Sequence, residues 1–106
     1  MAFYRRGRWF KSIWAHMNGF IYLIESTISG RGYLGSTNDP NRRIQDHNRG
    51  KNKATKNDKP WKCLLIINVD TLSEARRIEY YIKHHKEKLT VKKVIKILNR
   101  YYTTVG

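Results

Sequence analysis

The sequence has a single cysteine, Cys63, and no long hydrophobic run. One cysteine cannot form an intrachain disulfide, and it cannot build a zinc site on several thiolates. No apolar run approaches the ~20 residues that a membrane-spanning helix needs. The N-terminal segment is basic, but Lys11 and His16 interrupt its apolar residues, so it has no continuous apolar h-region and a secretory signal peptide is not predicted either. We therefore expect a cytoplasmic protein with neither a membrane span nor a disulfide partner.

Acidic residues are also scarce. Eight Asp and Glu face 22 Lys and Arg, which gives a formal net charge of +14. Such an imbalance repels itself in a compact chain and is typical of proteins that bind polyanions. Nucleic acid is the first partner that we consider and an anionic membrane surface the second. A basic surface that is simply solvated is the third interpretation. At 106 residues the chain is long enough for one domain.

Two strands are predicted in the first third of the chain. Residues 19–25 are rich in β-branched and aromatic side chains and contain no strand breaker. Residues 26–32 supply Ser, Thr and two glycines, which favour a turn. The second strand begins at Tyr33-Leu34-Gly35, and together the two strands predict a hairpin.

A polar helix is predicted next. Asn38 or Asp39 can cap it, Pro40 suits its first position, and Gly50 suits its end. Ile44 is its only aliphatic residue, so we expect this helix to present polar side chains and to add little to the core.

A basic, Asn-rich loop is predicted over residues 48–60. It is interpreted either as a solvated loop or as a mobile basic flap over a phosphate backbone, and the two interpretations are compatible. The candidate nucleic-acid-binding residues of the helix and the loop are Arg42, Arg49, Lys51, Lys53 and Lys56.

A third strand and a second helix follow. Residues 61–69 are apolar and β-branched, as expected for a central strand buried on both faces. Thr71 and Glu74 form a capping box for a helix that we expect to run to about Lys88. Glu79 falls at the rim of the apolar face of this helix, where a carboxylate would be partly buried beside the sheet.

The two ends of the chain are predicted to lie outside the domain of residues 19–100. Apolar residues at helical spacing predict a last helix over 89–98, and residues 101–106 are assigned to a tail. Residues 1–18 form a basic and aromatic arm. It could pack on the domain, bind nucleic acid by stacking and phosphate contacts, or be dispensable if translation starts at Met17.

These motifs, in this order, resemble the GIY-YIG nuclease family. Phe20-Ile21-Tyr22 stands where the family has its first motif, and Tyr33-Leu34-Gly35 stands for the second. Arg43 follows Tyr33 by ten residues, His47 lies one helical turn further on, and Glu79 follows the third strand on a helix. The resemblance covers about residues 19–82. It implies an α+β fold, with a small three-stranded antiparallel sheet flanked by helices, of the short stand-alone type.

The resemblance also implies a role for each polar residue. Tyr22 would activate water as a general base or relay its proton, and Tyr33 would hydrogen-bond into the site. Arg43 would hold phosphate oxygens with its planar fork. His47 would bond Tyr22 or the phosphate, or share the proton transfer, and Glu79 would hold one Mg²⁺ or Mn²⁺. A Tyr has an ordinary pKa of about 10, so nearby cations would have to lower the pKa of Tyr22.

The expected activity is metal-dependent hydrolysis of DNA phosphodiester bonds with low intrinsic sequence specificity. Each residue also has a common structural role; Glu79, for example, could simply pair with Lys83 four residues on. Two other interpretations stay open: a non-catalytic nucleic-acid-binding module on the same fold, and a small basic RNA-associated protein.

Overall fold

The computed structural model describes residues 2–4, 18–85 and 88–105, which form an α+β fold around one sheet. The sheet has the strand order β1-β4-β2-β3. The elements in chain order are β1 Ala2–Tyr4, β2 Gly19–Ser26, β3 Gly32–Thr37, α1 Pro40–Asn48, a 3-10 turn η2 Lys56–Asp58, β4 Trp61–Val69, α2 Leu72–His84 and α3 Val91–Val105.

The predicted antiparallel sheet of three strands is confirmed. β2 lies between β3 and β4 and pairs with both in antiparallel register, and β3 is an edge strand. A fourth strand was not predicted. Ala2–Tyr4 pairs in parallel with β4, which places part of the N-terminal arm on the sheet. The rest of that arm, residues 5–17, lies outside the described residues.

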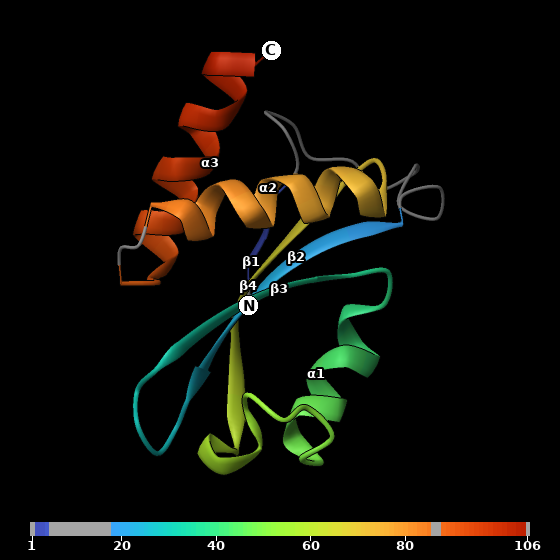
Figure 1. Ribbon diagram of the computed structural model, residues 1–106, viewed down its shortest axis with the longest axis vertical. Coiled ribbons are helices and arrows are strands. Elements are labelled where there is room, and N and C mark those ends of the chain that lie inside the picture. The colour runs from blue at the N-terminus through green and yellow to red at the C-terminus, as the bar shows by residue number, and fades with distance from the viewer. Residues whose placement is uncertain (1, 5–17, 86–87, 106) are drawn as a thin grey trace.

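The two faces of the sheet carry different layers. Figure 1 shows α2 and α3 on one face and α1 on the other, together with the loop that leads into β4. Neighbouring residues of β2 alternate between these faces: Ile21 and Leu23 pack with α2 and α3, whereas Tyr22 and Ile24 belong to a separate cluster on the α1 side.

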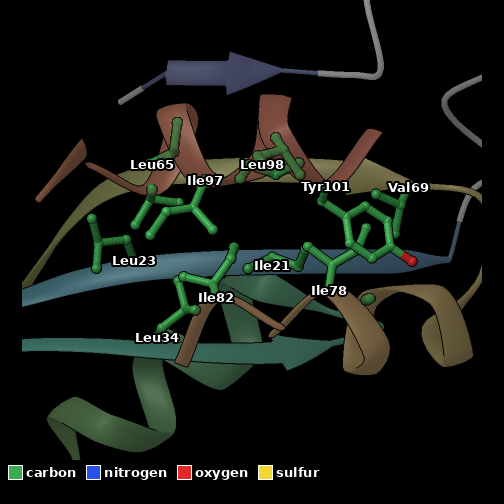
Figure 2. Close-up of a cluster of buried hydrophobic side chains, with 13 residues drawn as sticks. Ile21, Leu23, Leu34, Leu65, Val69, Ile78, Ile82, Ile97, Leu98 and Tyr101 are labelled. Atoms are coloured by element: carbon green, nitrogen blue, oxygen red, sulfur yellow. The ribbon is translucent and has the colours of Figure 1, made fainter. Parts of the chain in front are cut away.

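The main core lies between the sheet and the pair α2 and α3 (Figure 2). Its buried members come from β2, β3 and β4 and from both helices. They are Ile21, Leu23, Leu34, Leu65, Ile67, Val69, Ala75, Ile78, Ile82, Val94, Ile97, Leu98 and Tyr101. Helix α1 contributes no aliphatic residue to this list, as its polar sequence predicted.

Helix α1 begins and ends where the sequence placed its signals. Asp39 caps it by accepting a hydrogen bond from the Arg42 N–H at 3.2 Å, and Pro40 is its first residue. Gly50, with φ of 77°, ends the turn that follows. His47 is the one fully buried side chain of this helix. A polar residue therefore anchors α1 to the sheet, through its contact with Tyr22.

The last two helices differ from the prediction at their ends. Helix α2 ends at His84 rather than near Lys88. Helix α3 continues to Val105 and so takes in residues assigned to a tail. Tyr101 is 7% exposed as a member of the main core, and its ring packs edge-on against Tyr81 at a centroid distance of 5.1 Å. In the described part of the chain no helix is both long and apolar enough to cross a membrane.

Candidate active site

Tyr22 of β2 and Gly35 of β3 are direct partners in the antiparallel register. The phenol of Tyr22 lies flat across Gly35: a Cβ built on Gly35 would overlap the Tyr22 Oη and Cζ atoms. The missing side chain therefore lets the Tyr22 hydroxyl extend over the edge strand of the sheet. A glycine is required at this position of the second motif because any side chain would clash with the Tyr22 ring.

A chain of buried hydrogen bonds connects the sheet to α1 and to the loop after it. Tyr22 Oη lies 2.8 Å from His47 Nε2, and His47 Nδ1 lies 2.7 Å from Thr55 Oγ1. Tyr22 is 1% exposed, and His47 and Thr55 are fully buried. Burial, and to a smaller extent the positive charge of Arg43, lower the pKa of His47 to about 4. His47 is therefore a neutral imidazole at neutral pH.

Arg43 approaches the Tyr22 hydroxyl from the exposed face of α1. Its guanidinium donates toward the phenol oxygen, which lowers the pKa of Tyr22, but burial has the larger effect and raises that pKa to about 12. The condition that nearby cations lower the Tyr22 pKa is therefore not met in the protein by itself, because desolvation outweighs the one neighbouring cation, Arg43.

Tyr33 completes the aromatic side of the site. Its ring centroid lies 5.0 Å from that of His47 and 6.4 Å from that of Tyr22. It also meets Trp61 edge-on at 6.3 Å. The two motif tyrosines and the histidine thus form one contiguous group.

Glu79 approaches the same edge strand from the other face, on α2. Ser36 Oγ donates to its Oε1 at 2.5 Å, and Lys83 Nζ pairs with its Oε2 at 2.6 Å. Lys83 Nζ also lies 5.4 Å from the Tyr33 ring centroid. The negative charge of Glu79 contributes to the raised Tyr22 pKa, so the two groups are electrostatically coupled. The site is built around the edge of β3.

Glu79 supplies one carboxylate, which is the ligand type that Mg²⁺ and Mn²⁺ prefer. Its side chain is 20% exposed, and Ser36 and Lys83 contact its two oxygens, so a cation held there would have to displace the Lys83 ammonium. Among the described residues no three His, Cys, Asp or Glu side chains gather as a metal cluster. A cation held by Glu79 would therefore take its other ligands from water and phosphate.

The basic residues proposed to contact nucleic acid are all exposed: Arg42, Arg49, Lys51, Lys53 and Lys56. The loop that carries most of them is tied to the domain. Arg31 of the β2–β3 turn pairs with Asp58 at 2.8 Å and donates to the Ala54 carbonyl, also at 2.8 Å. Thr55 is buried against His47, so this loop is a structural part of the site as well as a basic surface.

The structure brings together all five residues that the sequence placed in the site: Tyr22, Tyr33, Arg43, His47 and Glu79. Three neighbours were not assigned to it. Ser36 orients the carboxylate, Lys83 pairs with it, and Thr55 anchors the imidazole. The i,i+4 spacing in the sequence indicated that Lys83 could pair with Glu79. The contacts of Ser36 with Glu79 and of Thr55 with His47 arise only in the tertiary structure.

The sheet, the motif tyrosines and the helix-borne arginine, histidine and glutamate define the class of a GIY-YIG domain. Residues 18–93 match the family model described as the GIY-YIG catalytic domain. This match covers most of the chain, and the chain therefore belongs to the GIY-YIG family.

Its relatives fall into two groups. UPF0213 protein YazA of Bacillus subtilis is 38% identical over 77 residues, which cover 72% of this chain and 73% of YazA. Structure-specific endonuclease subunit slx1 of Aspergillus oryzae is 45% identical over 51 residues, which cover 43% of this chain and 13% of that protein. The slx1 subunit of Xenopus laevis is 42% identical over 55 residues, or 45% of this chain and 20% of that protein. No solved structure matches the chain significantly.

Proposed function

We propose that this chain is a metal-dependent endonuclease that hydrolyses DNA phosphodiester bonds with low intrinsic sequence specificity. The observation that carries the proposal is the hydrogen-bonded group of Tyr22, His47 and Arg43, held beside Glu79 around one sheet edge. A strongly basic chain supplies the attraction for the substrate. Membership of a nuclease family and partial likeness to two endonuclease subunits support the same activity.

In the proposed mechanism each site residue has a separate role in the hydrolysis of the phosphodiester. The Tyr22 oxygen accepts a proton from the attacking water. The Arg43 guanidinium binds phosphate oxygens and stabilises the charge that develops on them. Tyr33 flanks the imidazole and orients the site. Glu79 would hold Mg²⁺ or Mn²⁺, which would contribute positive charge that polarises the phosphate and favours the ionised phenol.

Acting as a base requires an ionised Tyr22, whereas its pKa of about 12 keeps the phenol protonated at neutral pH in the protein alone. Arg43 already opposes this rise, and a divalent cation would oppose it further. The proposal therefore implies that the cleavage rate increases with pH above neutrality for as long as the protein stays folded.

The exposed positions of the basic side chains favour recognition of the phosphate backbone of the substrate. Exposed Arg and Lys side chains on α1 and its loop contact phosphates, which position a protein but carry no sequence information. The slx1 relatives are named structure-specific endonuclease subunits, so branched DNA belongs among the candidate substrates. We propose that backbone shape rather than base sequence selects the cleavage site.

The test is cleavage of labelled single-stranded, duplex and flap DNA with Mg²⁺ or Mn²⁺. Glu79→Gln removes the charge at the metal position, and Arg43→Lys keeps the charge but loses the planar fork. Each is expected to lower the cleavage rate by about 100-fold or more, the size of effect seen when one transition-state donor is removed. Arg77→Lys, at an exposed position of α2, is the matched control and should cleave like the wild type.

The main rival is a non-catalytic nucleic-acid-binding module on the same fold. It predicts binding that is the same with and without Mg²⁺, no cleavage of any substrate, and no effect of either variant. That set of results would exclude the nuclease. Salt-dependent binding does not distinguish the nuclease from the non-catalytic binding module, since both hypotheses predict it.

A further inference from the structure

Thr55 has no role in the mechanism above, yet it is one of the most completely buried polar residues of the described chain. Its hydroxyl lies 2.7 Å from His47 Nδ1. Its backbone is fixed as well: its N–H donates to the Asn52 carbonyl at 3.2 Å, and its carbonyl accepts from Trp61 Nε1 at 2.9 Å. The side chain is therefore held rigidly against the imidazole.

The available donors and acceptors indicate which of the two ring nitrogens of His47 carries the proton. A hydroxyl donates one hydrogen bond, and within the described residues His47 Nδ1 is the acceptor that Thr55 Oγ1 meets. If Nδ1 carried the proton of the neutral imidazole, the Thr55 proton would be buried without an acceptor, which is energetically unfavourable. If Nδ1 is bare, Thr55 donates to it and both groups are satisfied.

We propose that Thr55 is a positioning residue that fixes His47 in the Nε2–H tautomer, so that His47 donates a hydrogen bond to Tyr22 Oη. The phenol oxygen then accepts from both His47 and Arg43. When the phenol ionises, as the proposed mechanism requires, its oxygen carries no proton of its own and both donors face the phenolate.

This inference rests on the proposed nuclease function only for its catalytic consequence. Two donors aimed at one phenol oxygen stabilise the phenolate, because hydrogen bonds to an ionised acceptor are stronger than those to a neutral one. His47 then supports Tyr22 as a hydrogen-bond donor and is not the acceptor of its proton. Of the roles that the family resemblance left open for His47, this selects the bond to Tyr22.

The direct test is the tautomeric state of His47, read from the nitrogen chemical shifts of histidine-labelled protein by nuclear magnetic resonance at neutral pH. The signals are assigned by comparison with His47→Gln. The expected result is a protonated Nε2 and an unprotonated Nδ1. Observation of the Nδ1–H tautomer in the wild type would overturn the proposal, whatever the variants do.

Two variants test Thr55 itself. Thr55→Val is close in shape but lacks the hydroxyl, whereas Thr55→Ser keeps it. In Thr55→Val the His47 signals should shift toward the other tautomer or a mixture, and kcat should fall by at least roughly tenfold with KM within about twofold. Thr55→Ser should restore both the tautomer and kcat.

The outcomes separate the two proposals. An Nε2–H imidazole in a wild type that never cleaves DNA would support the tautomer and reject the nuclease. An unchanged His47 tautomer in a folded Thr55→Val would reject the role of Thr55 even if the enzyme is active. If Thr55→Val does not fold, the wild-type spectrum and Thr55→Ser still decide the question.

Discussion

Gly35 lies under the phenol of Tyr22 so closely that even a methyl group at this position would occupy the space of the Tyr22 hydroxyl. The two residues are also direct partners across β2 and β3. The proposed base therefore packs directly on the backbone of the edge strand. It can lie there only because Gly35 has no side chain.

Gly35→Ala should therefore displace Tyr22 and destabilise the fold. Overpacking of this kind costs about 1–3 kcal/mol, and the displaced hydroxyl should also lower cleavage. The measurement is chemical denaturation of a double-mutant cycle with Tyr22→Ala. In the Tyr22→Ala background the same substitution has room for its methyl group and should cost little. Equal costs in both backgrounds would show that the contact with Tyr22 is not the reason for the glycine.

The loop after α1 should contribute to DNA affinity through its lysines. Lys53 and Lys56 are exposed on the side of the sheet that carries the Tyr22 cluster. Lys53→Gln with Lys56→Gln should weaken binding and reduce the slope of log K against log salt by about 1–2. The matched control is Lys92→Gln with Lys96→Gln, two exposed lysines of α3 on the other side of the sheet (Figure 1). Equal losses for both pairs would indicate a charge effect without a localised binding face.

The buried imidazole should make stability depend on pH. The pKa of His47 is about 4 in the folded protein and 6.5 for an unperturbed histidine. Between these values the unfolded chain binds more protons, so the free energy of unfolding should fall as pH drops from 6.5 to 4. For this shift the loss amounts to roughly 3 kcal/mol. Denaturation at several pH values would measure it, and His47→Gln should flatten this part of the curve. Parallel curves for the two proteins would contradict the assignment.

The end of helix α3 should matter for stability. Tyr101 is buried in the main core, so Tyr101→Ala should lower the free energy of unfolding by about 3 kcal/mol. Thr103→Ala, at an exposed position of the same helix, should change it by less than about 0.5 kcal/mol. Thermal or chemical denaturation decides between a structural helix and a tail, because a tail would tolerate both substitutions.

The prediction of the elements from the sequence misses one short strand and misplaces the ends of the last two helices. Ala2–Tyr4 is too short for any periodicity to reveal it, and its pairing with β4 is a long-range contact. The aliphatic spacing that predicts the last helix ends at Leu98, whereas α3 continues to Val105. Tyr101 is buried because it belongs to the main core and packs edge-on against Tyr81 of the neighbouring helix.

The sequence by itself determined the order of the main elements, the start of α1 at a cap in Asn38 or Asp39, and the set of five polar residues that were assigned to the site. These follow from local chemistry: strand alternation, capping, and helical spacing act over a few residues, and the family motifs lie within them. Only the tertiary structure decided that Gly35 supports Tyr22, that Ser36 orients Glu79, and that Thr55 meets His47. It also decided the direction of the Tyr22 pKa, since desolvation depends on everything packed around the phenol and not on its neighbours in the chain.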